Sequence, residues 1–504
     1  MATHDGDMDD TSRRHPLLAA QEGIWAGQQL DPDSPAYNTA EYVLIDGPVD
    51  TAGFDAALHH VVAETEALNV AFVVDDQGRP WQTDAPAGDW RLHTADLTTE
   101  PDPHATALAW MGEDMARPVD LARGPVFGHA LLRVAPEQYL WYHRVHHIAL
   151  DGFGLSLVAR RVAQVYTALA AGEPVEDSGF GTLAAVRDEE RAYRDSPRFA
   201  KARAYWADRF ADRPPVATPA GRTALPARTF HRRVAELDAT ETEVLRAVAR
   251  DLKLTWSEVL LAVTAAQLHH TTGAPEIVLS LPTMGRLGSV ALRVPCMVRN
   301  ILPLRVAVTA SDSLRDLAAR VSRELRAGLP HQRYRYEQLR RDLRLVGGQR
   351  RLSGPGVNIM PFEYDLRFAG HRSTVHNVSA GPVDDLSVNV YDRSEGGGLR
   401  IAVDANPDLY DEADVAALQE GLLSLLREAV AAPDRALGDL RAREPVPVLD
   451  GGPLPGPVRP VLGLIADHAA RRGGSVGGAP RRRPPEHIPT LGGGGGRARP
   501  RARP

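Results

Sequence analysis

A seven-residue segment, HHIALDG at residues 146–152, constrains the fold more than any other part of the chain. Residues 139–145 before it are rich in aromatic and β-branched side chains, which predicts a strand. After it, apolar residues recur every three or four positions from 155 to 169, which predicts an amphipathic helix ending near Gly172 and Pro174. The segment is therefore expected to be a rigid strand-to-helix turn beside a helix N-terminus, where negative charge is favoured.

The residue types in this turn indicate proton transfer. A neutral imidazole near pH 7 can accept a proton from an amine or hydroxyl group, or donate a hydrogen bond to an oxyanion. Asp151 can hold an arginine or orient a histidine, and Gly152 can provide a backbone angle or a close approach that a side chain would block. Two other histidine pairs, at 59–60 and 269–270, have no following Asp-Gly and are expected to be ordinary helix-surface residues.

The composition is that of a large cytoplasmic enzyme. With 504 residues, 43% of them hydrophobic, the chain can fill two cores, and no apolar run reaches the roughly 20 residues of a membrane span. The acidic, polar N-terminus is not a signal peptide, and the single cysteine, Cys296, excludes an internal disulfide and favours a reducing compartment. The net charge of −7 argues against binding to nucleic acid.

Strand and helix patterns alternate along the chain, which predicts an α/β architecture. The expected elements are a helix at 54–68, a hairpin turning at 135–138, strands at 277–281 and 301–308, and helices at 314–325 and 411–431. Two further helices are expected to open with capping boxes, Thr240 with Glu243 and Thr255 with Glu258.

Several other chemistries lack the sequence patterns that they require. The chain has no cysteine cluster for zinc, no Gly-x-Ser-x-Gly nucleophile elbow and no Gly-x-Gly-x-x-Gly between a strand and a helix. It also has no carrier-protein serine motif for a phosphopantetheine arm. We therefore expect no directly bound cofactor or metal, and acyl groups that are brought by partner proteins.

The turn and several segments around it resemble a known family. HHIALDG matches the His-His-x-x-x-Asp-Gly motif of condensation domains in nonribosomal peptide synthetases, which are chloramphenicol-acetyltransferase-like acyltransferases. The resemblance covers about residues 15–445 and includes LLAAQEGIWAGQQL at 17–30, weaker motifs at 59–72 and 180–186, VPCMVRNILPL at 294–304, HQRYRYE at 331–337 and Asp-Leu-Ser at 385–387. Within the family, HPLLAAQEGIW, HQRYRYEQL and GPVDDLSVNVY are most similar to the first domain of serine-activating synthetases of the enterobactin type.

The resemblance implies two chloramphenicol-acetyltransferase-like lobes that form a V-shaped pseudo-dimer around a central cleft. The expected domains are a disordered N-terminus at 1–14, an N-terminal lobe at 15–190 and a C-terminal lobe at 191–445. A proline- and glycine-rich linker and the start of an adenylation-like domain are expected at 446–472. The biased segment 473–504 is expected to be a dispensable, disordered and non-native tail rather than a nucleic-acid-binding arginine-glycine tail.

The resemblance also implies a reaction. The amine of an aminoacyl thioester would attack an acyl thioester, both presented as phosphopantetheinyl thioesters on carrier proteins, without a covalent enzyme intermediate. His147 is expected at the reacting centre, as general base, as positioning group or as stabiliser of the intermediate. His146 is expected to support the turn next to it.

Further site residues follow from the family pattern. Asp151 is expected to form an ion pair with Arg286, and Asn300 and Asn358 are expected to line the substrate channel. The enterobactin-type resemblance implies an aryl donor, such as 2,3-dihydroxybenzoate, on an upstream carrier protein acting in trans, because the domain begins near residue 15. It also implies serine or a similar acceptor, loaded by downstream adenylation and peptidyl carrier domains.

Four alternatives are weighed against this interpretation. An epimerisation domain would carry a Glu-Gly-His-Gly-Arg pattern that the chain lacks, and a cyclisation domain would replace the two histidines with aspartates. A stand-alone acyltransferase that uses coenzyme A or a carrier thioester stays open. So does an inactive, truncated docking module.

Overall fold

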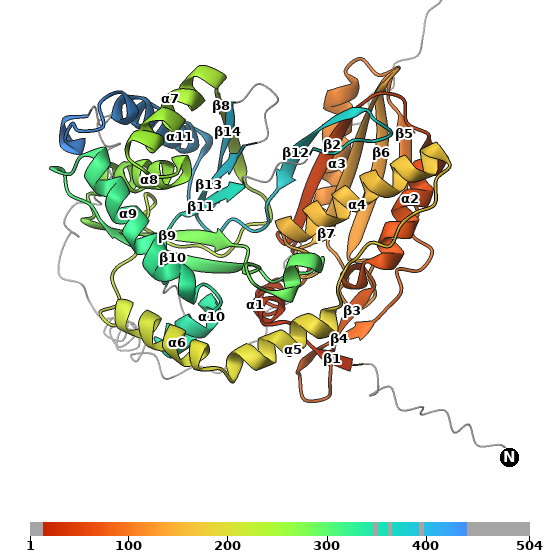
Figure 1. Cartoon of the computed structure of the whole chain (residues 1–504), viewed down its shortest axis with the longest axis horizontal. Helices are drawn as coiled ribbons and strands as arrows, with labels where there is room; N and C mark the ends of the chain where they lie inside the picture. Colours follow the sequence, from red (N-terminus) through yellow and green to blue (C-terminus); the bar gives the residue numbers. More distant parts are fainter. Residues whose placement is uncertain (1–13, 346–350, 361–364, 393–397, 441–504) are drawn as a thin grey trace, which may run out of the picture. The chain divides into compact units, whose positions relative to one another are not determined.

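Two β-sheets covered by helices hold most of the described residues (Figure 1). The structure is a computed structural model that describes residues 14–345, 351–360, 365–392 and 398–440. The described residues belong to one unit, and residues 446–504 lie outside the described residues. The predictions for 446–472, for 473–504 and for the N-terminus before Arg14 therefore concern residues outside the described part.

The first sheet has five strands in the order β12-β2-β7-β6-β5. Neighbouring strands are antiparallel except β5 and β6, which are parallel. Its strands are β2 (Asn38–Asp46), β5 (His93–Asp96), β6 (Phe127–Ala135), β7 (Gln138–His146) and β12 (Arg372–Ser379). The hairpin predicted at 135–138 is the turn between β6 and β7, and the strand predicted at 139–145 is β7.

Side chains alternate between the two faces of this sheet, so each face packs against different helices. On β7, Trp141 packs in the cluster that contains α2 (Thr51–Glu64) and α4 (Gly152–Ala171), whereas Tyr142 packs with α3 (Pro103–Met115). Helix α4 is the helix predicted after the motif. Because both faces of β7 are covered, the strand end that carries the motif is held rigidly.

The edge strand β12 comes from the part of the sequence that was expected to form the other lobe. It pairs antiparallel with β2. Phe368, just upstream of β12, is fully buried, and its ring centroid lies 5.8 Å from that of Phe54 in α2. The lobes predicted as 15–190 and 191–445 are therefore not independent stretches of sequence, since the second supplies a strand and a core residue to the first.

The second sheet has six strands in the order β10-β9-β11-β13-β14-β8. Strand β11 is parallel to both of its neighbours, β9 and β13, and the other pairs are antiparallel. Its strands are β8 (His231–Leu237), β9 (Glu276–Thr283), β10 (Asn300–Ala307), β11 (Gly356–Met360), β13 (Leu386–Tyr391) and β14 (Leu399–Ala405). The strands predicted at 277–281 and 301–308 are β9 and β10.

One large apolar core joins this sheet to the helices that cover it. These helices are α7 (Ala239–Asp251), α8 (Trp256–Thr272), α9 (Leu314–Gly328) and α11 (Glu412–Ala431). Helix α8 is buried at every position from 259 to 266, as expected of a helix that is surrounded by other elements. The helices predicted at 314–325 and 411–431 are α9 and α11.

One of the two predicted capping boxes is present, and the other is replaced by an earlier one. Thr255 caps α8 and exchanges hydrogen bonds with Glu258. The prediction that Thr240 caps α7 is wrong. Asp238 is the cap: its carboxylate accepts the Glu241 N–H at 2.8 Å, and the Glu241 carboxylate accepts the Asp238 N–H at 3.1 Å. An aspartate in extended conformation two residues upstream therefore starts the helix before the threonine can.

The remaining elements flank or connect the two sheets. A small three-stranded sheet has the order β1-β4-β3. The elements are β1 (Arg14–Pro16), β3 (Val70–Val74), β4 (Pro80–Asp84), α1 (Ala19–Gln28), α5 (Leu183–Arg194), α6 (Pro197–Arg209), α10 (Tyr336–Asp342) and the 3-10 helices η2 (Glu66–Leu68), η3 (Val290–Arg293), η4 (Leu329–His331) and η5 (Leu437–Asp439).

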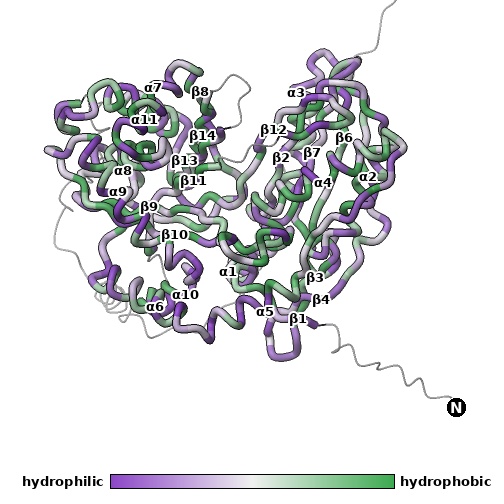
Figure 2. The backbone as a smooth tube through the Cα atoms, viewed as in Figure 1, coloured by the Kyte–Doolittle hydropathy of each residue, from purple (hydrophilic) through white to green (hydrophobic). Residues whose placement is uncertain are grey.

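Hydrophilic residues, in purple, predominate along α6 in Figure 2, consistent with its mostly exposed side chains. Within the described ranges, no helix combines the length and hydrophobicity of a membrane span.

Candidate active site

The motif forms a tight turn between the end of β7 and the start of α4. A backbone hydrogen bond holds this turn to the segment before β2: the His147 N–H donates to the Tyr37 carbonyl at 2.8 Å. The apolar residues at 148–150 in the middle of the turn are buried. Burial of this apolar centre fixes the histidines at one end of the turn and Asp151 at the other.

Asp151 caps α4, and hydrogen bonds occupy both of its carboxylate oxygens. Oδ1 accepts the Gly154 N–H at 2.8 Å and Arg286 Nη2 at 2.7 Å. Oδ2 accepts the N–H groups of Val298 and Arg299, both at 3.1 Å. Burial opposes ionisation, but Arg286 and the backbone donors hold the pKa of Asp151 below its ordinary value. Donors from distant parts of the sequence thus converge on one carboxylate.

Arg286 lies in the loop after β9 and forms the predicted ion pair with Asp151. The two side chains are 0% and 3% exposed. The guanidinium also donates to the carbonyls of Val294 and Cys296, at 2.9 and 2.7 Å, and its carbon lies 5.0 Å from the ring centroid of Phe153. Removing either charge would strand the other in the interior, so the pair fixes this loop against the motif.

The sequence predicted that Gly152 meets a steric requirement, but in the structure that requirement lies at Gly154. The expected need for a glycine at 152 is wrong, because its φ lies outside the left-handed region and a Cβ there would meet no heavy atom within 4 Å. A close approach occurs at Gly154 instead, where a Cβ would lie 3.0 Å from the Cys296 carbonyl oxygen. The first turn of α4 therefore packs on the backbone near Cys296, while Gly152 lines the pocket.

Both ring nitrogens of His146 have hydrogen-bond partners. The Ile148 N–H donates to Nδ1 at 3.2 Å, so this nitrogen is unprotonated and Nε2–H donates to Gln28 Oε1 at 3.0 Å. The Gln28 amide donates in turn to three carbonyls of the loop that follows α1. Burial lowers the pKa of His146 to about 3, which keeps the ring neutral. This arrangement supports a structural role for His146.

His147 has one bound ring nitrogen and one open one. Its Nδ1 donates to the Leu150 carbonyl at 2.9 Å, which places the proton on Nδ1 and leaves a lone pair on Nε2. Nε2 is buried and has no hydrogen-bond partner among the described residues. Burial lowers the pKa of His147 well below its ordinary value, and the charge of Arg299 lowers it further. The ring is therefore neutral near pH 7 and can act as a base.

A cavity of about 660 Å³, measured out to its open mouth, lies beside His147. Pockets of this size accept small organic groups. Its lining residues come from both sheets and from α4: Thr39, Glu41, His147, Asp151, Gly152, Phe153, Leu155, Pro282, Thr283, Met284, Arg299, Asn358, Ile359, Met360, Asn377, Ser379 and Ala380. Four of the predicted site residues, His147, Asp151, Gly152 and Asn358, therefore meet in one pocket.

Asn300 does not line this pocket, although it was predicted to lie in the same channel. Its Nδ2 donates to the carbonyls of Gln332 and Tyr334, both at 2.7 Å, and its Oδ1 accepts the Tyr336 N–H at 3.1 Å. These bonds hold the HQRYRYE segment against the start of β10. Asn300 lines a separate cavity next to α5, and its amide group supports the backbone there.

Sequence reasoning missed two charged residues of the pocket, Glu41 on β2 and Arg299 just before β10. Each interrupts an otherwise largely apolar run, AEYVLI and CMVRNILPL. A charged residue in a strand that is buried on both faces must meet a polar site or a partner. This pattern was the available signal for both.

The chain just after β12 closes the pocket over the His147 ring. Gly381 has a φ of +104°, a conformation that other residues rarely adopt. A Cβ at this position would lie 3.1 Å from His147 Cδ2 and 3.6 Å from Nε2. A side chain here would therefore crowd the ring of His147 beside its open nitrogen.

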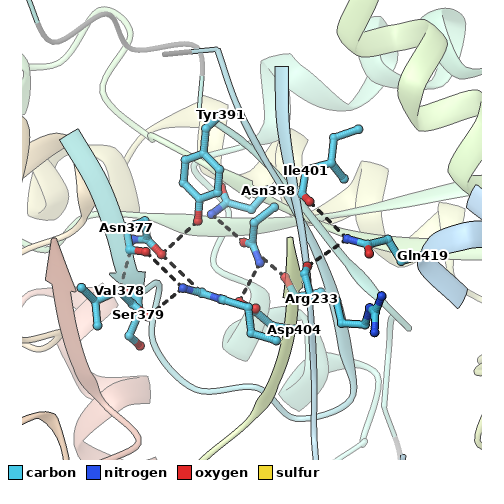
Figure 3. Close-up of polar contacts among 12 residues, drawn as sticks. Arg233, Asn358, Asn377, Val378, Ser379, Tyr391, Ile401, Asp404 and Gln419 are labelled. Atoms are coloured by element: carbon cyan, nitrogen blue, oxygen red, sulfur yellow. Dashed lines mark hydrogen bonds and ion pairs between the residues drawn. The ribbon is translucent and has the colours of Figure 1, made fainter. Parts of the chain in front are cut away.

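A polar cluster on the second sheet holds the end of β12, and Figure 3 shows Asn377, Tyr391 and Asp404 within it. Arg232 on β8 donates to the carbonyls of Asn377 and Val378, at 3.1 and 2.8 Å. The same guanidinium forms a bidentate pair with Asp404, at 2.6 and 2.7 Å. Tyr391 Oη donates to Asn377 Oδ1 at 3.0 Å. The cluster ties an edge strand of the first sheet to the second sheet at the wall of the pocket.

The family model for the condensation domain matches residues 11–445. This chain belongs to the condensation domains of nonribosomal peptide synthetases. Such domains are amide-forming acyltransferases that act on thioesters brought by carrier domains, so the predicted class of enzyme is confirmed. Among the residues that the structure describes, no group of three or more His, Cys, Asp or Glu side chains is placed to hold a metal ion.

The curated relatives of this condensation domain are much longer than the chain. It is 86% identical to an isonitrile lipopeptide synthase of Streptomyces coeruleorubidus, over 94% of the chain and 33% of the relative. It is 49% identical to a dimodular nonribosomal peptide synthase of Bacillus subtilis (strain 168), over 86% and 18%. Identity to enterobactin synthase component F of Shigella flexneri is 32%, over 85% and 34%. The chain thus spans about a third or less of these relatives' length.

Solved condensation domains have the same fold. The first condensation domain of the calcium-dependent antibiotic synthetase, in complex with a substrate analogue, gives a TM-score of 0.80 at 36% identity, over 86% of this chain and 99% of that one. A double mutant of the starter condensation domain of rhizomide synthetase, in complex with C8-CoA and Leu-SNAC, gives 0.80 at 37% identity, over 85% and 97%. These matches confirm the predicted α/β fold with two chloramphenicol-acetyltransferase-like lobes.

Proposed function

We propose that this chain forms an amide bond between an acyl thioester donor and an aminoacyl thioester acceptor, each held on the phosphopantetheinyl arm of a carrier domain. The main support for the proposal is that His147 lines a cavity of about 660 Å³ and that its Nε2 has no hydrogen-bond partner among the described residues. The ring is neutral near pH 7, so the acceptor amine meets a base there.

The open nitrogen of His147 accounts for the proton transfers of aminolysis. Nε2 accepts a proton as the acceptor amine attacks the donor carbonyl carbon and the C–N bond forms. The tetrahedral intermediate then collapses, the C–S bond breaks, and the imidazolium returns the proton to the leaving sulfur. Holding two tethered thioesters in one pocket makes the reaction effectively intramolecular.

In this mechanism Asp151 positions the turn and transfers no proton. Donors already occupy both of its oxygens, and His147 Nδ1 donates to the Leu150 carbonyl rather than to the carboxylate. Ionised Asp151 is instead the anchor for the loop that carries Arg286 and for the first turn of α4.

The proposed donor is an apolar acyl group. Apolar side chains line part of the pocket: Phe153, Leu155, Met284, Ile359 and Met360. Burial of a hydrocarbon chain against them stabilises the complex by about 0.8 kcal/mol per CH₂ group. The name of the 86% identical relative, an isonitrile lipopeptide synthase, favours an aliphatic chain. The enterobactin-type resemblance, at 32% identity, favours the aryl donor predicted from the sequence. We propose the aliphatic chain because that relative is far more similar.

The proposed partners are an upstream carrier domain that delivers the donor and downstream adenylation and peptidyl carrier domains that deliver the acceptor. Whether the donor carrier acts in trans stays a prediction. The names of the relatives, a lipopeptide synthase and a dimodular peptide synthase, support a multidomain setting of this kind.

A competition between donor carriers tests the proposal. The chain is incubated with one aminoacyl carrier and equal amounts of octanoyl-, 2,3-dihydroxybenzoyl- and aminoacyl-loaded donor carriers, and the amides are measured by mass spectrometry. We expect the octanoyl amide in excess by about tenfold, which corresponds to 1.4 kcal/mol. An excess of the 2,3-dihydroxybenzoyl amide would instead support the aryl donor that was predicted from the sequence. In a parallel incubation with octanoyl-coenzyme A and free amines, product formed there alone would favour a stand-alone acyltransferase, and no product in either incubation would favour a docking module.

A further inference from the structure

Arg299 lines the reaction pocket, yet its guanidinium has no hydrogen-bond or ion-pair partner among the described residues. Two other arginines near the site differ in this respect. Arg286 and Arg232 each donate to a carboxylate and to backbone carbonyls. A charged group that leaves water is stable only with acceptors around it. An arginine that is left open toward a reaction pocket therefore indicates an acceptor that arrives with the substrate.

The backbone of Arg299 is held in place by the motif itself. Its N–H donates to Asp151 Oδ2 at 3.1 Å, and its carbonyl accepts Arg335 Nη1 at 2.7 Å. The next residue, Asn300, is fixed by three hydrogen bonds to the segment at 332–336. The backbone of Arg299 is thus hydrogen-bonded to Asp151, the same carboxylate that holds the turn containing His147. A donor positioned in advance stabilises developing charge without a cost of reorganisation.

The charged groups around Arg299 leave its charge available. They are Asp151, Arg335 and Glu337; the Tyr37 phenol beside them is neutral near pH 7, because burial raises its pKa. Asp151 is occupied by other donors, and Glu337 lies 3.4 Å from Arg335. Burial lowers the pKa of Arg299, but a guanidinium stays protonated near neutral pH. Positive charge therefore remains at the pocket next to His147.

We propose that Arg299 is a catalytic residue that stabilises the negative charge on the donor carbonyl oxygen during amide formation. The inference rests on the proposed amide-forming function and deepens it. As the amine nitrogen bonds to the carbonyl carbon, the π electron pair moves to the oxygen, which accepts N–H bonds from Arg299 while His147 Nε2 takes the amine proton. On collapse, the electron pair re-forms the carbonyl, the C–S bond breaks, and His147 protonates the thiolate.

Three variants and one control test the assignment: Arg299→Leu, Arg299→Gln, Arg299→Lys and Arg293→Gln. Arg293 is a matched cation that donates to the Gly179 carbonyl on an exposed part of the chain, outside the pocket. Rates are measured over a range of octanoyl carrier concentrations with saturating aminoacyl carrier, which gives kcat and KM, and melting temperatures are measured alongside. Loss of one oxyanion donor lowers the rate by about 100- to 1,000-fold. We expect this loss in kcat for Arg299→Leu, little change in KM, partial recovery in Arg299→Lys and the wild-type rate for Arg293→Gln.

The pH profile gives a second readout, one that a merely structural residue would not move. The charge of Arg299 lowers the pKa of His147. Arg299→Gln removes that charge, so the pKa of His147 rises and the acid limb of the rate profile shifts to higher pH. Arg299→Lys keeps the charge and leaves the limb near its wild-type position.

Several results would overturn the inference. They are a kcat for Arg299→Leu within threefold of wild type, an effect confined to KM, or an acid limb that is identical in Arg299→Gln and wild type. If Arg299→Leu does not fold, the Gln and Lys variants decide by the same criteria. Wild-type chain that makes no amide from any carrier pair overturns the proposed function as well, whereas an active wild type with unaffected variants overturns only the role of Arg299.

Discussion

The two sides of the motif turn differ in how completely their polar groups are satisfied. On the closed side, formed by His146, Asp151 and Arg286, each side chain has buried partners within the chain, and among these groups only Arg286 Nε lacks one among the described residues. On the open side, His147 and Arg299 line the pocket, and neither His147 Nε2 nor the Arg299 guanidinium has a hydrogen-bond partner among the described residues. The contrast separates two kinds of buried polar residue. We propose that those on the closed side hold the framework and that those on the open side act on the substrate.

The largest expected effect is on the open side. His147→Ala should reduce amide formation by about 100- to 10,000-fold, the usual contribution of a general base. The fold should persist, because the imidazole makes a single hydrogen bond within the described part of the chain. Single-turnover rates and melting curves check this, with His60→Ala as the control, since His60 lies on the surface of α2 and, among the described residues, pairs with Glu64 alone. Amide formation near the wild-type rate would remove His147 from the chemistry.

The second largest expected effect is a loss of folding stability when the ion pair on the closed side is broken. Asp151→Ala or Arg286→Ala should each cost about 3–5 kcal/mol, because each strands a buried charge. The double variant should cost less than the sum of the two, since no charge is then left alone. Guanidinium unfolding of the three variants measures this. If each single variant loses less than about 1 kcal/mol of unfolding free energy, the range of exposed ion pairs, then this pair stabilises the fold no more than a surface pair does.

A smaller effect concerns acid stability and the buried neutral histidines. Burial lowers the pKa of His129 and His146 to about 3, whereas an unfolded histidine titrates near 6.5. Below about pH 6.5 the unfolded chain therefore binds more protons than the folded one, and stability falls as the pH falls. Neither ring nitrogen of His129 has a partner among the described residues, and the ring packs among aromatic side chains.

His129→Phe tests this behaviour without touching the motif. The variant should unfold at the same denaturant concentration as wild type at pH 7.5, or a higher one, and lose less stability between pH 7.5 and 5.5. Each group that titrates only in the unfolded state contributes a slope of up to about 1.4 kcal/mol per pH unit. Equal slopes for the two proteins would exclude His129 as a source of the acid sensitivity.

Local pattern predicted the framework of the site well. The strand before the motif, the helix after it and the cap of α8 follow from side-chain periodicity and capping chemistry, which act within a few residues. The pairing of Asp151 with Arg286 came from the family resemblance, since the two residues are far apart in sequence. The pattern overstated the need for a glycine at 152, because neither the backbone angle nor the space around a Cβ requires one there.

Other features depend on distant contacts that no local pattern encodes. The pairing of β12 with β2 is one, because a strand's partner and register depend on which edge is free. The same limit applies to Asn300, whose amide supports the backbone at 332–336 instead of facing the channel. Arg299 could be noticed as a charge in an apolar run, but only the three-dimensional pocket shows that it lacks a partner.

The position of β12 in the sequence has a consequence for synthesis of the chain on the ribosome. Strand β7 ends at His146, whereas β12 begins at Arg372, so β2 stays an exposed edge while the intervening residues are made. Domains usually fold in order as they are translated, and an open edge strand invites pairing with other chains. The first sheet of this protein can be completed only after most of the second half has been translated. A gene cut between the lobes would therefore yield an N-terminal product that lacks an edge strand and is prone to aggregate.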